Sequence, residues 1–72
     1  MHLHINGTLR DLPQLPAGAT LAQALTALEL KADRVAVEHN GVIVARSAWD
    51  ATPLHDEDKL EIVQFVGGGC AR

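Results

Sequence analysis

Residues 1–12, MHLHINGTLRDL, contain the pattern that decides the fold. Leu3 and Ile5 alternate with histidines, as in a strand with one buried face, and an Asn-Gly dipeptide follows at positions 6–7. This dipeptide is typical of two-residue type I′ hairpin turns, because both of its residues adopt positive φ readily. We therefore expect two antiparallel strands here, the second over 8–12.

Two further stretches predict strands. Residues 35–44, VAVEHNGVIV, place two apolar runs around a second Asn-Gly dipeptide, which predicts another hairpin. Residues 59–66 predict the last strand, with its apolar side chains on alternate faces. Segment 46–54 contains Trp49 and a proline, and we expect an irregular crossover in which the tryptophan fills the core.

One helix is expected between the two hairpins. Thr20 and Gln23 have the spacing of a capping box, in which each side chain accepts a hydrogen bond from the other residue's backbone N–H. The helix is expected over about 21–29, where an apolar stripe recurs at helical spacing, formed by Leu21, Ala24, Leu25 and Leu28. The element order β-β-α-β-β-β predicts an α+β fold with a sheet of about five strands on one helix.

The composition limits what such a chain can do. Seventy-two residues, 47% of them hydrophobic but only 3% aromatic, form one small domain, expected over 1–66, without a deep substrate pocket. A net charge of −3 argues against nucleic acid as a partner. We expect neither a signal peptide nor a membrane span, and the single Cys70 excludes an internal disulfide framework. These features favour the cytoplasm.

Residues 67–72, GGGCAR, follow the last strand directly, and we expect them to form a flexible tail. Glycines without Cβ atoms can enter a narrow active-site channel and approach a nucleotide closely. The alternative is a frayed chain end without a role.

The two Asn-Gly hairpins, the single capped helix, Trp49 before an acidic turn and the glycine run resemble the ThiS family, the sulfur carrier proteins of thiamine biosynthesis. The segment 60–69, LEIVQFVGGG, is most similar to that family's C-terminal signature, and the resemblance spans residues 1–69. It implies the ubiquitin-like β-grasp fold, with a mixed sheet.

The resemblance implies a carrier and not an enzyme. An E1-like adenylyltransferase of the ThiF type would adenylate the carboxylate of Gly69, using ATP and Mg. Sulfur that comes ultimately from a cysteine desulfurase would then convert the adenylate to a thiocarboxylate, and thiazole synthase of the ThiG type would take the sulfur. Gly67, Gly68 and Gly69 would thread the partner's active site, and no cofactor would be bound stably to the carrier itself.

The sequence departs from the family pattern after Gly69, where Cys70-Ala71-Arg72 follows. With this extension Gly69 has an amide in place of a free carboxylate, so we expect a processing peptidase to cut after Gly69. As an alternative, Cys70 itself could hold sulfur as a persulfide.

Alternation in the last strand places Val63 and Phe65 on its outer face, beside the tail. They are candidates for a hydrophobic surface that docks the activating enzyme, although Phe65 could equally cover a sheet edge. The four histidines lack an obvious ligand set, and we expect His2 and His4 to lie on a solvated strand face without a metal.

Other functions share these features. A MoaD-like or other β-grasp sulfur carrier would have the same glycine terminus and the same adenylation step. A ubiquitin-like protein modifier would join its tail to lysines, and an interaction domain would leave its tail inert.

Overall fold

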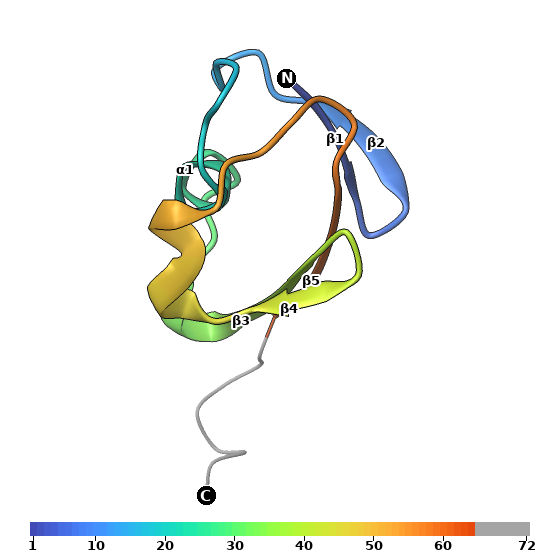
Figure 1. The fold of residues 1–72 in the computed structure, drawn as a ribbon. Coiled ribbons are helices and arrows are strands. Elements are labelled where there is room, and N and C mark those ends of the chain that lie inside the picture. Colours follow the sequence, from blue (N-terminus) through green and yellow to red (C-terminus); the bar gives the residue numbers. More distant parts are fainter. Residues whose placement is uncertain (65–72) are drawn as a thin grey trace, which may run out of the picture.

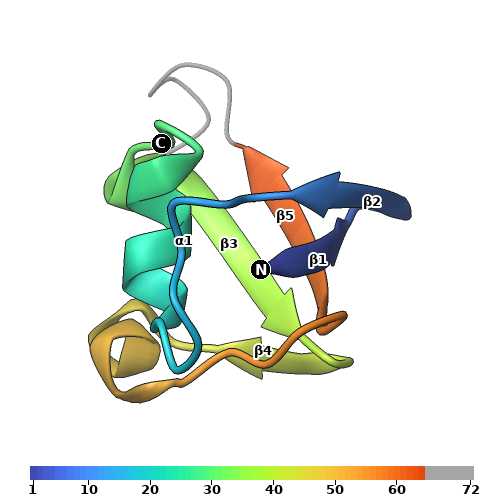
Figure 2. The ribbon, with the colours of Figure 1, turned by 90° about the horizontal axis from the view of Figure 1, so that it is seen from above.

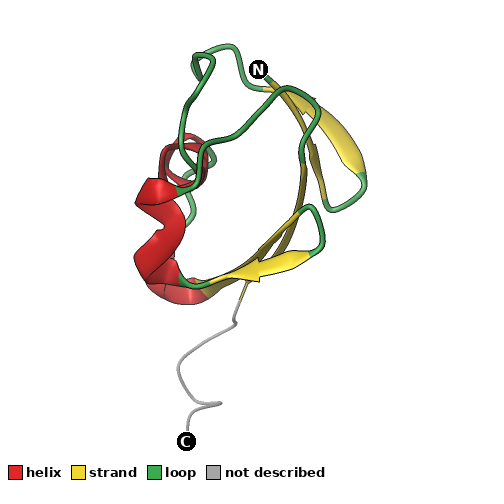
Figure 3. Cartoon of the chain, viewed as in Figure 1, coloured by secondary structure: helices red, strands yellow, loops and turns green. Residues whose placement is uncertain are grey.

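The computed structural model describes residues 1–64 of the chain, except for the side chain of Ala32. Within this part, five strands, one α-helix and two short 3₁₀ helices make up the regular structure (Figures 1 and 3). The predicted order of strands and helix is confirmed, whereas the 3₁₀ helix η1 was not predicted. In chain order the elements are β1 (His2–Ile5), β2 (Thr8–Asp11), α1 (Leu21–Ala27), η1 (Ala32–Arg34), β3 (Val35–His39), β4 (Val42–Val44), η2 (Arg46–Ala51) and β5 (Lys59–Gln64).

Both Asn-Gly dipeptides form the predicted hairpin turns. Asn6 has a φ of 52° and Asn40 a φ of 50°, and the glycine that follows each asparagine also has a positive φ. Positive φ at both central residues is characteristic of the type I′ turn, whose twist matches that of the strands it joins. The turn fixes the register of the first hairpin, in which Ile5 lies opposite Thr8.

The last strand, β5, lies in the middle of the sheet, whose order is β2-β1-β5-β3-β4. It runs parallel to β1, with Leu60 beside Ile5, and antiparallel to β3, with Ile62 beside Val37. Figure 2 shows β5 between these two strands. The expected architecture, a mixed five-stranded sheet on one helix as in the β-grasp fold, is therefore confirmed.

Helix α1 begins at the predicted capping box. The Thr20 hydroxyl accepts a hydrogen bond from the Gln23 backbone N–H at 3.3 Å, and the Gln23 side chain accepts one from the Thr20 N–H at 2.8 Å. The helix is shorter than expected because Glu29 adopts a φ of 61° and ends it. The Leu30 N–H then bonds back to the Leu25 carbonyl, as in a Schellman motif.

The core lies between the inner face of the curved sheet and the layer formed by α1 and η2 (Figure 1). Trp49 of η2 is buried, and its indole N–H donates to the Val44 carbonyl at 3.0 Å, so the prediction that it fills the core is confirmed. Besides Trp49, the buried apolar residues are Leu3, Ile5, Leu12, Leu15, Ala19, Leu21, Ala24, Leu25, Val35, Val37, Leu54, Leu60 and Ile62.

Among residues 1–64 no helix is long and apolar enough to cross a membrane.

Candidate functional site at the end of β5

The strand that leads to the glycine run, β5, has a neighbouring strand on each side. Its described part ends at Gln64, so the predicted site residues Phe65 and 67–69, and the extension 70–72, lie outside the described residues. Val63 is the predicted site residue that the structure places. The described residues therefore define the base from which the predicted tail begins.

On its β1 side, β5 is held by a side chain beyond the point where β1 ends. The Asn6 carboxamide accepts a hydrogen bond from the Ile62 N–H at 2.7 Å and donates one to the Ile62 carbonyl at 3.1 Å. These are the bonds that a continuation of the β1 backbone would supply. The Asn6 backbone N–H also bonds to the Leu60 carbonyl at 2.9 Å. Asn6 therefore fixes β5 to within two residues of its described end.

This role of Asn6 predicts a large effect of Asn6→Gly. Glycine keeps the positive φ of the turn but removes both carboxamide bonds and leaves the Ile62 backbone without these partners. We expect the free energy of unfolding, measured by urea titration, to fall by about 1–3 kcal/mol. Glu57→Gly is the matched control, since Glu57 is also exposed and also has a positive φ, of 68°, but its side chain forms no hydrogen bond within residues 1–64. Equal effects of the two substitutions would contradict the role of the carboxamide.

On its β3 side, the start of β5 is tied down by a polar cluster. The Asn40 side chain accepts a hydrogen bond from the Lys59 N–H at 2.8 Å, and His39 Nε2 lies 2.7 Å from Asp58 Oδ2. The Asp58 carboxylate also accepts the His55 backbone N–H at 2.9 Å. These contacts join the turn before β5 to the β3–β4 hairpin, so both Asn-Gly turns hold the same strand.

The ionisation of Asp58 is set by this cluster. Burial alone would raise the pKa of its carboxyl group, because the side chain is only 13% exposed. Hydrogen bonds from His39, from the His55 backbone and from Asn40 outweigh burial and lower the pKa from its ordinary value of 3.8. Asp58 is therefore held as a carboxylate, which accepts all of these bonds.

The lowered pKa of Asp58 predicts how stability depends on pH. A carboxyl group whose pKa is lowered by folding stabilises the folded state above its ordinary pKa, and loses that contribution as the pH falls through the lowered value. We expect Asp58→Asn to be less stable than the natural chain near neutral pH, and the difference to shrink below about pH 4. Urea unfolding of both chains from about pH 7 to about pH 2.5 measures this; a constant difference over that range would contradict it.

The alternation predicted for β5 is confirmed by the burial of its side chains. Leu60 and Ile62 face the core, whereas Val63 is 61% exposed on the outer face of the sheet. Ile43 on the edge strand β4 is 76% exposed on the same side of the hairpin, and the sequence analysis did not identify it. The run Val-Ile-Val at 42–44 did carry a signal of an exposed apolar residue. A strand without any polar residue must place an apolar side chain on whichever face meets solvent.

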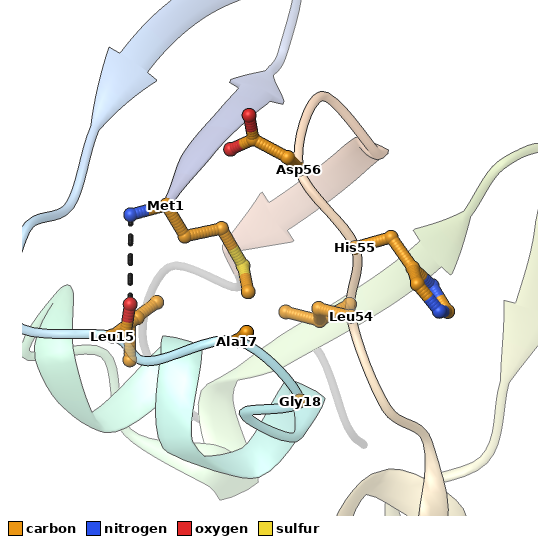
Figure 4. A pocket seen from close by; sticks show the side chains of 7 residues that line it. All are labelled: Met1, Leu15, Ala17, Gly18, Leu54, His55 and Asp56. Carbon is orange, nitrogen blue, oxygen red and sulfur yellow. Dashed lines mark hydrogen bonds between the residues drawn. The ribbon is translucent and has the colours of Figure 1, made fainter.

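An apolar pocket of about 300 Å³ lies near the start of β5 (Figure 4). In Figure 4 the Met1 and Leu54 side chains point toward one another across it, and the N-terminal ammonium group donates to the Leu15 carbonyl at 3.5 Å. The length of β5, about 20 Å for six residues, separates this pocket from the end of the strand. Its lining therefore lies away from Gln64, the last described residue of the strand.

Three of the four histidines, His2, His39 and His55, lie within 4 Å of an aspartate carboxylate. Nitrogens of the half-exposed His2 side chain lie 3.7 Å from Asp11 Oδ1 and 3.7 Å from Asp56 Oδ1. Among residues 1–64, no group of three or more His, Cys, Asp or Glu side chains is placed to hold a metal ion.

Comparisons with known proteins agree with this fold, and the match to one protein family includes the glycine run. The model of the ThiS family matches residues 3–69. The sulfur carrier protein ThiS of Bacillus subtilis is 34% identical over 67 residues, which cover 93% of this chain and 98% of that protein. The crystal structure of the thiamine biosynthesis protein ThiS from Geobacter metallireducens is 36% identical and superposes with a TM-score of 0.80, covering 96% of this chain and all of that one.

The chain is also similar to a part of two longer proteins. It is 38% identical to the thiazole synthase of Magnetococcus marinus and 42% identical to that of Paramagnetospirillum magneticum, over 69 residues in each case. These residues make up 96% of this chain, but the chain spans only about a fifth of the length of either synthase.

Proposed function

The chain belongs to the ThiS family, and on this premise we propose that it is a sulfur carrier of thiamine biosynthesis, which delivers sulfur from a thiocarboxylate on Gly69. The observation that carries the proposal is the extent of the family match, which includes the whole glycine run and ends at Gly69. The fold supports it, because β5, the strand that precedes this run, is fixed in the centre of the sheet.

The proposed chemistry begins at the carboxylate of Gly69. A carboxylate is a poor electrophile, so an E1-like activating enzyme first joins it to the α-phosphate of ATP, and pyrophosphate leaves. The terminal sulfur of a persulfide then attacks the acyl carbon and AMP leaves. A thiol breaks the resulting S–S bond, which leaves the thiocarboxylate on the carrier and a disulfide on the donor side. Catalysis belongs to the partners, while this chain supplies the group that is modified.

The carrier body sets how far the reactive group can reach. Gly69 lies five positions after Gln64, the last described residue of β5, and five residues of extended chain span at most about 18 Å. The partner must therefore bind the body close to its own nucleotide. Glycines suit the last part of this path, since a backbone without Cβ atoms passes through a narrow channel.

The Gly69–Cys70 bond must be cut before this chemistry can begin. In the sequence the acyl carbon of Gly69 belongs to a peptide bond, and an amide offers no free oxygen to the α-phosphate. We propose that a peptidase cuts after Gly69 and releases residues 70–72. The need for cleavage follows from the presence of this one peptide bond.

Thiazole synthase is the proposed acceptor of the sulfur. Two proteins named thiazole synthase contain a segment similar to nearly the whole of this chain. A carrier-like segment and a synthase in one polypeptide support a working contact between the two kinds of protein. We therefore propose a ThiG-type thiazole synthase as the partner that takes the sulfur from this chain.

The proposal is tested by transferring sulfur to the chain that ends at Gly69. The reaction contains the E1-like enzyme of the same organism, Mg-ATP, cysteine, a cysteine desulfurase and a thiol. We expect intact-mass measurement to show one oxygen replaced by one sulfur, only when ATP is present. The control is the chain that ends at Val66, which should stay unmodified. If the same enzyme releases AMP from ATP with a known sulfur carrier but this chain gains no sulfur, the proposal is overturned. Lysine adducts would favour a protein modifier.

A further inference from the structure

The outer face of the sheet carries apolar side chains next to two carboxylates. Ile43 of β4 and Val63 of β5 are 76% and 61% exposed, and Ala36 of β3 lies opposite Val63. Glu38 of β3 and Glu61 of β5 stand beside them in the register. These five residues, here called the acidic-apolar face, line a hollow of about 110 Å³.

The two glutamates form a pair of like charges. Glu38 and Glu61 lie directly opposite each other in the antiparallel pairing of β3 with β5. Like charges at directly opposite positions destabilise a sheet. Within residues 1–64 every ion pair joins a histidine to an aspartate, so neither glutamate has a cationic partner in the part of the chain that the structure describes. A cation from another molecule would relieve their repulsion.

We propose that the acidic-apolar face docks the activating enzyme, and that this enzyme places an arginine or lysine side chain between Glu38 and Glu61 and apolar side chains on Ile43 and Val63. The inference rests on the proposed function. Charge complementarity defines the contact, because two opposed carboxylates without a cationic partner among residues 1–64 attract a cationic side chain from another molecule. Arginine suits the face best, since its planar guanidinium pairs with carboxylates and its stem covers apolar surface.

The position of the face matches the reach of the tail. Val63 lies six positions before Gly69, and six residues of extended chain span at most about 22 Å. A partner seated on this face therefore has Gly69 within reach of a nucleotide bound beside the contact. The apolar pocket near Met1 and Leu54, at the start of β5, is farther away by most of the length of that strand.

Glu61→Lys separates docking from stability. The substitution places opposite charges across the β3–β5 pair, so we expect the unfolding midpoint to stay unchanged or rise by up to about 5 °C. It also puts a cation against the partner's cation, so we expect the dissociation constant for the activating enzyme to rise at least about tenfold at low salt. Calorimetric titration measures it for the full chain and for the chain that ends at Gly69. If Glu61 affected only the stability of the sheet, Glu61→Lys would raise the unfolding midpoint without weakening the binding of the activating enzyme.

Asp50→Lys is the matched control. It makes the same change of charge at an exposed position in η2, which packs on α1, away from the outer face of the sheet. We expect binding to change less than about twofold in this variant, because net charge alone acts at long range and is screened by salt. Ile43→Ser provides a second, uncharged variant at an exposed site, and it should weaken binding several-fold without loss of the folded state.

The outcomes separate this inference from the proposed function. If the natural chain ending at Gly69 gains sulfur and Glu61→Lys still binds the activating enzyme as tightly, the docking inference is overturned while the carrier function stands. If Glu61→Lys and Asp50→Lys weaken binding equally, general charge explains the effect and the face is not the contact. Loss of binding to thiazole synthase alone would assign the face to that partner and also overturn the inference.

Discussion

In cells that lack their own copy of this chain, thiazole formation is expected to return when the chain is supplied ending at Gly69, and to stay absent when Cys70→Pro is supplied instead. Proline removes the N–H at the bond to be cut and restricts the residue before it, so most peptidases cannot process it. The loss should be complete, because in an uncut chain Gly69 has no free carboxylate to react with ATP. Growth without added thiazole and the intact mass of the recovered chain measure the two effects.

Cys70→Ser decides between the two proposed positions of the sulfur. If Gly69 carries it, Cys70→Ser should support growth like the natural chain, because residue 70 is discarded. If Cys70 carries it as a persulfide, both Cys70→Ser and the chain that ends at Gly69 should fail. Growth with Cys70→Pro, together with recovery of the uncut chain, would contradict the requirement for processing.

The hairpins were predictable because their signals are local. An Asn-Gly dipeptide favours positive φ through its own two residues, and both turns are found where the sequence placed them. The helix start was equally local, since the Thr20 and Gln23 side chains satisfy each other's backbone N–H groups. Its end was not, because Glu29, in a conformation that usually favours glycine, gives no stop signal.

The base of the candidate site depends on contacts that the sequence could not reveal. The hydrogen bonds of Asn6 to Ile62 join residues 56 positions apart, and hairpin propensity says nothing of them. In the same way, alternation tells which side chains share a face but not which strand lies at an edge. Ile43 is exposed because β4 is the outermost strand, a fact of topology that emerges only once β5 has inserted between β1 and β3.

The opposite faces of β5 should respond very differently to the same kind of truncation. Leu60→Ala removes a fully buried side chain at the centre of the sheet, beside Ile5 and His39 in the register. Such substitutions cost about 2–5 kcal/mol through lost burial and the cavity left behind. A domain of this size has about 4–10 kcal/mol of net stability in all, so we expect Leu60→Ala to lose about half of it and to unfold at a far lower temperature.

Val63→Ala, three residues further along the same strand, provides the control. Val63 is 61% exposed, so its truncation should change the free energy of unfolding by less than about 0.5 kcal/mol. Its effect should appear instead as weaker binding to the activating enzyme, because its methyl groups lie on the acidic-apolar face. Urea unfolding and calorimetric binding, measured on both variants, test this division. If Val63→Ala lowered stability as much as Leu60→Ala, then the outer face would serve folding, and its exposed apolar side chains could no longer be explained by docking.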